Sequence, residues 1–145
     1  MPQTFTSSKR GYGLMSRLQS VQNAAARLVT GVRRCEHITP VLRQLHWLPV
    51  RRRVEFKIST LVYRSLADTA PVYLADECTV TAAGRRPLQS ADSQTCAVKR
   101  SRNQFGDRSF ATASPTLWNS LPVQFWQPDI TFRQFKRSIK TFMFG

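Results

Sequence analysis

The sequence has few acidic residues, and this scarcity limits the chemistry that the chain can perform. Its 145 residues include 8 Asp and Glu against 22 Lys and Arg. Two-metal nucleotidyl transfer needs several carboxylates at one place, because each divalent ion takes hard oxygen ligands. Here the acids are scattered, and even the adjacent pair Asp76-Glu77 is typical of helix caps or charge partners. We therefore expect no catalytic metal.

Paired Cys and His spacings are missing as well. Cys35, His37, His46 and Cys78 are possible ligands, but none stands at the C-x₂₋₄-C or H-x₃₋₅-H spacing of structural zinc sites. With Cys96 the cysteines number three, an odd and irregular set that does not suggest a disulfide scaffold. We expect no metal and no cofactor, and the sequence assigns the three thiols no role.

Long apolar runs and glycine-rich phosphate loops are also absent. Without an apolar run we expect neither a signal peptide nor a transmembrane segment, and predict an intracellular protein, nuclear or cytoplasmic and not secreted. Gly11 and Gly13 lie close together but follow no predicted strand. No nucleophile signature occurs. The chain is therefore predicted not to be an enzyme by itself.

What the sequence has in excess is positive charge. The formal net charge is +14, with a pI near 11.2. Most of the cations are Arg, whose planar fork binds phosphate in two places at once. Nucleic acid is the first partner that such a charge suggests, followed by an anionic membrane and an acidic protein. The alternative is a fragment whose charge was balanced by a missing parent protein.

Helical periodicity dominates the first half of the chain. Over 14–30 apolar residues recur at spacings of 4, 3, 4 and 3, with Gly31 as a C-cap. Thr39 and Pro40 predict the N-cap and first residue of a short helix, which Pro49 closes, and Pro49 can also open a long helix over 50–67. One more turn is predicted from Pro71 to Ala75.

The second half is less regular. Gly106-Asp107 predicts an N-cap, and Ser114-Pro115 predicts a second cap that would divide the following helix. Thr131 and Gln134 form a capping box before an amphipathic helix. Its apolar face carries Phe132, Phe135, Ile139 and Phe142, and its cations line the neighbouring face: Arg133, Lys136, Arg137 and Lys140.

These patterns predict a mainly α fold, a small helical domain with an irregular basic linker and a C-terminal amphipathic helix. We expect a flexible tail (1–13), a helical front (14–78), a basic linker or loop (79–104) and a helical C-terminal part (105–145). The predicted core consists of Leu14, Leu18, Leu28, Val54, Ile58, Leu61, Trp118 and the terminal Phe stripe.

Basic patches are the candidate binding residues. Three consecutive arginines occupy the first turn of the 50–67 helix, where cations oppose the helix dipole and indicate a bound anion. Phe56 and Tyr63 near these cations suggest base stacking; the alternative is that both belong to the core. The candidate nucleic-acid contacts are Arg33, Arg34, Arg51, Arg52, Arg53, Lys57, Arg64, Arg85, Arg86, Lys99, Arg100 and Arg102.

An ordered set of short motifs runs through residues 14–143. They are LQSVQNAAARL (18–28), HITPVL (37–42), LHWLPV (45–50), APVYL (70–74), FGDRSF (105–110) and LWNSLP (117–122). In this order they resemble the extreme C-terminal region, downstream of the palm, of reverse transcriptases from LINE-type, jockey-like non-LTR retrotransposons. The final Phe-rich helix also resembles that family's ending.

The resemblance implies a thumb-and-tail region that helps to hold RNA or DNA without reading its sequence, beside the rest of a reverse transcriptase. The family is an RNA-directed DNA polymerase, but its acidic Tyr/Phe-Ala-Asp-Asp motif does not occur here, and Leu66-Ala67-Asp68 is only a superficial echo. The implied product is a non-catalytic fragment.

Two alternatives remain open at this point. The initial Met and unmatched tail suit a reading frame in a truncated element copy, an inert remnant without a selected function. The cationic helix over 131–143 could instead be a membrane-surface or protein-interaction module.

Overall fold

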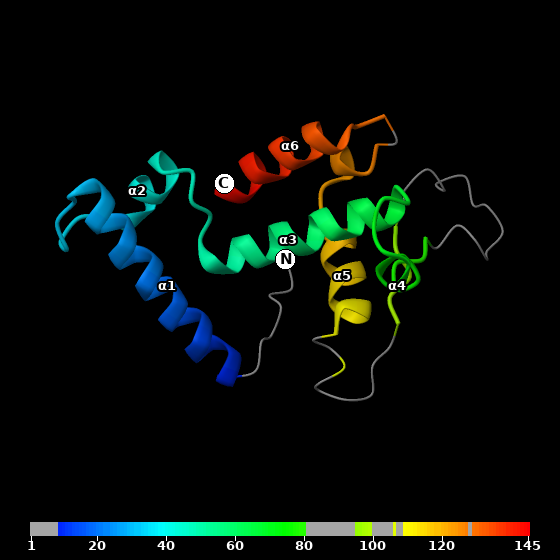
Figure 1. The fold of residues 1–145 in the computed structure, drawn as a ribbon, viewed down its shortest axis with the longest axis horizontal. Helices are drawn as coiled ribbons and strands as arrows, with labels where there is room; N and C mark the ends of the chain where they lie inside the picture. The colour runs from blue at the N-terminus through cyan, green and yellow to red at the C-terminus, as the bar shows by residue number, and fades with distance from the viewer. Residues whose placement is uncertain (1–8, 81–94, 100–105, 107–108, 128) are drawn as a thin grey trace. The chain divides into compact units, whose positions relative to one another are not determined.

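The computed structural model describes residues 9–80, 95–99, 106, 109–127 and 129–145. Throughout these ranges the fold is mainly helical, as the sequence predicts (Figure 1). The helices are α1 (Lys9–Thr30), α2 (Ile38–Gln44), α3 (Val50–Leu66), α4 (Val72–Ala75), α5 (Phe110–Asn119) and α6 (Phe132–Phe144), with a 3₁₀ turn, η3 (Val123–Phe125).

The chain divides into two compact units. The N-terminal unit comprises Met1–Val54 with Phe144, and the C-terminal unit comprises Glu55–Met143 with Gly145. The boundary thus falls within α3. The predicted division at 79–104 does not coincide with it, and most of those residues lie outside the described ranges, as do residues 1–8 of the predicted tail; residues 9–13, also predicted as tail, instead begin α1.

The N-terminal unit is built around the contact between α1 and α2 (Figure 1). Ala26, Val41 and Leu42 form its buried cluster, and Val32, Ile38, Leu45 and Trp47 pack against it. Gly31, at φ 71°, ends α1 as predicted.

Glutamine side chains join α1 to the segment that enters α3. The Gln19 Oε1 atom accepts a hydrogen bond from the Val50 backbone N–H at 2.8 Å, and Gln22 Nε2 donates to the Leu48 carbonyl at 2.8 Å. Gln19 Nε2 in turn donates to Asn23 Oδ1 at 2.8 Å. The Gln19 and Gln22 side chains of α1 therefore make contacts inside the N-terminal unit.

The apolar stripe of α1 is correspondingly exposed, which corrects the predicted core. Leu14, Leu18 and Leu28 are 65%, 55% and 85% exposed, and Val54 is also exposed. The sequence pattern identified the stripe, but the stripe does not form the interior of the unit, because amide hydrogen bonds and Ala26 occupy the packed face instead.

Two left-handed residues end helices without glycine. At the end of α2, His46 has φ 55°, its N–H bonds to the Arg43 carbonyl, and Trp47 N–H bonds to the Leu42 carbonyl. This pair of bonds is a Schellman motif. Asp68, with φ 53°, holds the corresponding position after α3, where Thr69 N–H bonds to the Arg64 carbonyl.

The C-terminal unit has an aromatic core. Phe135 of α6 is fully buried, and its ring centroid lies 4.6 Å from Tyr63, 5.8 Å from Trp118 and 6.1 Å from Phe125. The Tyr63 hydroxyl donates a hydrogen bond to the Ile130 carbonyl. The predicted burial of Trp118 is confirmed, whereas Ile58 and Leu61 are only partly buried.

The terminal stripe of α6 is only partly internal. Phe135, Ile139 and Met143 are buried, while Phe132 and Phe142 remain partly exposed. The capping box at Thr131 and Gln134 is confirmed, because each side chain accepts from the other residue's backbone N–H.

The other predicted helix starts need correction. The N-cap of α2 is His37, so Pro40 is the third helical residue, still within the first turn, where a missing N–H breaks no helical bond. Residues Ser114 and Pro115 do not divide α5; the Ser114 hydroxyl donates to the Phe110 carbonyl instead of capping a new helix. The N-cap of α5 is Ser109, and the predicted cap residue Asp107 lies outside the described residues.

Candidate nucleic-acid interface

Positive charge is concentrated in the N-terminal unit. Residues 1–54 contain ten Lys and Arg and a single acid, Glu36, a difference of nine. Residues 55–143 contain twelve Lys and Arg and seven acids, a difference of five in a longer segment. The net positive charge per residue is therefore higher in the N-terminal unit, which should attract an anionic ligand more strongly than the C-terminal unit does.

Arg33 and Arg34 lie exposed in the loop between α1 and α2. The loop is shaped by backbone and side-chain bonds: Glu36 N–H donates to the Arg33 carbonyl at 3.2 Å, and Arg27 Nη2 donates to the Glu36 carbonyl at 3.3 Å. Both arginines thus project from a turn, a position from which long side chains reach a phosphate backbone.

Arg51, Arg52 and Arg53 form the first turn of α3 together with Val50, and all three are exposed. That turn contains no acid, so the positive end of the helix dipole meets three further positive charges. The start of the turn is fixed by the Val50 N–H bond to Gln19 Oε1 and by the Arg53 N–H bond to the Pro49 carbonyl at 2.8 Å.

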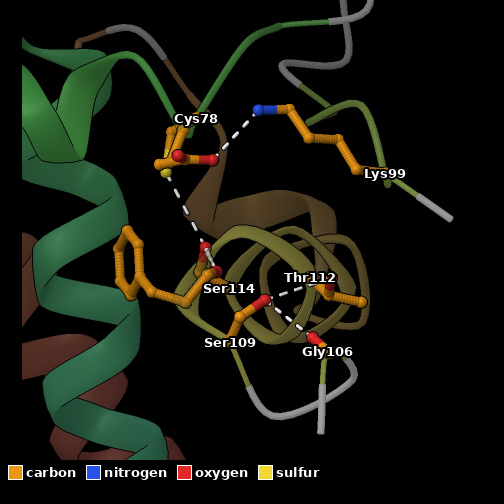
Figure 2. Close-up of polar contacts among 8 residues, drawn as sticks. Cys78, Lys99, Gly106, Ser109, Thr112 and Ser114 are labelled. Carbon is orange, nitrogen blue, oxygen red and sulfur yellow. Dashed lines mark hydrogen bonds and ion pairs between the residues drawn. The ribbon is translucent and has the colours of Figure 1, made fainter. Parts of the chain in front are cut away.

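Two other candidates have partners inside the C-terminal unit. Arg64 Nη2 donates to the Thr69 carbonyl at 2.9 Å, which makes this arginine part of the α3 terminus. Lys99 Nζ lies 3.0 Å from Glu77 Oε2 (Figure 2). Lys57 is exposed. The candidates Arg85, Arg86, Arg100 and Arg102 lie outside the described residues.

The expected stacking surface is not present at Tyr63. Its ring stacks on Phe135 and its hydroxyl is bonded within the unit, so the core alternative describes it correctly. Phe56 is half-buried. Among the described residues, the candidate interface therefore consists of cations and does not include the Tyr63 ring.

A row of cations on α6 lies outside the set of candidate contacts that the sequence predicts. Arg133, Lys136 and Arg137 are exposed, Lys140 is half-buried, and α6 contains no acid. Lys136 Nζ lies 5.5 Å from the Phe132 ring centroid, within cation–π range. The sequence indicates this row because cations spaced three or four residues apart, which share one face of a helix, follow the Thr131–Gln134 capping box.

The two buried thiols, Cys78 and Cys96, are in unreactive settings. Cys78 Sγ lies 3.8 Å from Ser114 Oγ (Figure 2), and Cys96 is held by Asn119, which exchanges two hydrogen bonds of 2.9 Å with its backbone. Burial, and to a smaller degree the neighbouring Cys78, raises the pKa of the Cys96 thiol to about 12. A thiol that stays protonated is a poor nucleophile.

In the part of the chain that the structure describes, no three His, Cys, Asp or Glu side chains are grouped so as to hold a metal ion. None of the described helices is both long enough and apolar enough to span a membrane. Comparisons of the chain with models of known families, with curated proteins and with solved structures give no match.

Proposed function

We propose that the chain binds nucleic acid through phosphate contacts, without reading its sequence, and that the exposed arginines of the N-terminal unit make these contacts. The observation that carries the proposal is the charge of that unit, ten cations with one acid, together with the exposure of Arg33, Arg34 and the Arg51–Arg53 turn. The motif resemblance supports the same function, that of a non-catalytic C-terminal fragment of a LINE-type reverse transcriptase.

A phosphate interface needs no groove and no aromatic platform. Arginine forks bind phosphate oxygens bidentately, and each neutralised phosphate releases condensed counterions. Such binding is expected to weaken steeply with salt and to differ little between sequences.

The membrane alternative for residues 131–143 has less support. Phe135 and Ile139, the residues that would enter a bilayer, are fully buried within the C-terminal unit, so α6 would have to leave its core to bind lipid.

The test is fluorescence anisotropy with labelled single-stranded RNA, duplex RNA and duplex DNA across a salt series. The variant R51Q/R52Q/R53Q should weaken binding to all sequences alike and flatten the slope of log affinity against log salt by roughly 2–3 for duplex DNA. The matched control R133Q/K136Q/R137Q removes the same charge from α6.

A triple variant of α3 that binds as the parent does would overturn the assignment of the interface. Equal losses in both triple variants would show that net charge, not the arginine turn, governs binding. Folded protein without saturable binding would favour the inert-remnant alternative.

A further inference from the structure

The exposed stripe of α1 is the largest run of uncovered apolar side chains on any one described helix. Leu14, Leu18, Val21, Leu28 and Val29 are all more than half exposed. The neighbouring face of the same helix carries Ala26 and the Gln19 and Gln22 hydrogen bonds. The helix therefore cannot rotate to bury its leucines without breaking the contacts that hold it.

The spacing of the stripe indicates what covers it. Leu14, Leu18, Val21, Ala25 and Leu28 recur at 4, 3, 4 and 3, the a/d pattern of a coiled-coil seam. A seam this narrow fits a second helix lying alongside. A helix that enters a lipid surface usually has a broader apolar face with Trp or Phe, and the stripe carries neither.

The charged residues beside the stripe indicate which kind of helix would bind to it. In the heptad register with Leu18 and Ala25 at a, the flanking g positions are Arg17 and Ala24, and no Asp or Glu occurs anywhere in α1. A partner with carboxylates at its own flanking positions would pair with Arg17 and with the field of the basic unit.

A second copy of the chain fits less well. It would bring the same positive charge, +14 on each chain. Covering five Leu and Val side chains that expose roughly 100 Å² each buries about 500 Å² per partner, against about 800 Å² for a stable interface. Self-association through this face alone is therefore disfavoured.

From these observations we propose that the α1 stripe docks an acidic amphipathic helix of another protein. The contact is of the weak class, because its area is small, and opposite charge supplies its specificity. This inference does not depend on nucleic-acid binding.

The probe is a synthetic 28-residue peptide with Leu at every a and d position and Glu at every e and g position, which keeps it from pairing with itself. A matched peptide carries Lys in place of each Glu. Titration calorimetry with the full chain should show saturable binding of the Glu peptide and binding at least about tenfold weaker for the Lys peptide, a difference of about 1.4 kcal/mol.

Variants locate the site. L18Q/L28Q should weaken Glu-peptide binding about tenfold or more, since it removes two seam residues while keeping helix propensity. The control V72Q/V123Q changes two equally exposed residues of the C-terminal unit and should leave affinity within about twofold. R17E should reduce the preference for the Glu peptide over the Lys peptide, because the field of the basic unit remains.

Several outcomes would overturn the proposal: equal affinity for both peptides, unchanged affinity in L18Q/L28Q, or loss of helical circular dichroism in that variant, which would place the leucines in a core. A dimer of the parent chain in sedimentation that L18Q/L28Q abolishes would assign the stripe to a second copy. Stripe-dependent binding to anionic vesicles would assign it to a membrane surface.

Discussion

Both units of the chain enclose a small interior between helices, but different kinds of side chain fill the two interiors. The N-terminal unit uses three small or aliphatic residues, Ala26, Val41 and Leu42, together with glutamine hydrogen bonds. The C-terminal unit uses interlocking rings around Phe135. The difference shows that helical amphipathicity defines two faces of a helix without deciding which of them its own unit buries.

The units also differ in what they leave at the surface. Each unit exposes several large apolar side chains, but those of the N-terminal unit gather on one helix, α1, beside ten cations and one acid, whereas the C-terminal unit carries seven acids with its twelve cations. The positive charge of the N-terminal unit is therefore much less balanced by acids than that of the C-terminal unit. The following variants test this contrast, beginning with the largest expected effect.

Removing the central ring of the C-terminal unit should cost most. F135A deletes a fully buried side chain that contacts three other rings, and should lower the free energy of unfolding by about 3–5 kcal/mol in urea titrations followed by Trp fluorescence. F142A, at a half-exposed position that contacts Phe125, should cost less than half as much. Equal losses would mean that the core is not centred on Phe135.

The buried thiol of the same unit should make its stability depend on alkaline pH. The pKa of Cys96 is about 12 in the fold and about 9.0 for an unperturbed thiol, so the unfolded chain releases this proton first. The contribution is complete below pH 9 and is lost as pH rises toward 12, on the order of 1 kcal/mol for each pH unit. Parallel denaturation of C96A across this range should show a shallower decline; identical slopes would contradict the assignment.

The amide contacts of the N-terminal unit should have an intermediate effect. Q19A removes the acceptor of the Val50 N–H and should cost about 1–2 kcal/mol, measured by hydrogen exchange of that amide and by denaturation. Q44A, at an exposed position near the end of α2, is the matched control and should stay within about 0.5 kcal/mol. If Q19A were equally silent, the glutamine contacts would not hold α1.

The smallest effect is expected at the apolar stripe itself. L28Q changes a residue that is almost fully exposed and should alter the free energy of unfolding by less than about 0.5 kcal/mol. L42A, in the buried cluster of the same unit, should cost about 2–4 kcal/mol in the same thermal or urea experiment. A large loss of stability in L28Q would show that the leucines of α1 are packed in a core and that the stripe is not its exposed face.

Much of the fold was predictable because its signals are local. The periods of α1, α3 and α6, the Gly31 cap and the Thr131–Gln134 capping box each depend on residues within a few positions of one another. The orientation of α1 was not predictable in this way, because it depends on Gln19 and Gln22 reaching residues 26 to 31 positions later.

Helix ends were harder to predict where the usual residue is absent. His46 and Asp68 adopt the left-handed conformation usually taken by Gly, so the residue types at these two positions did not identify the stops, although α3 ends at Leu66, one residue before its predicted end. Ser114-Pro115 gave the opposite error, a start signal within a continuous helix, since Ser114 bonds back to Phe110.

The candidate interface divides similarly. The exposure of Arg51–Arg53 follows from the polar character of those positions, but the use of Arg64 at a helix end and the pairing of Lys99 with Glu77 depend on tertiary contacts. Composition predicted the sign of the surface charge; it did not predict its concentration in residues 1–54, which requires the division into units.

The distribution of the three thiols has a practical consequence for spectroscopy. Cys35 is exposed in the N-terminal unit, while Cys78 and Cys96 are buried in the C-terminal unit. A maleimide dye added under native conditions should therefore label Cys35 alone. A second thiol reagent added during unfolding should then label Cys78 and Cys96 as the C-terminal unit opens. Without any engineered cysteine, the chain has one thiol to which a fluorophore can be attached and two buried thiols whose labelling follows the unfolding of the C-terminal unit.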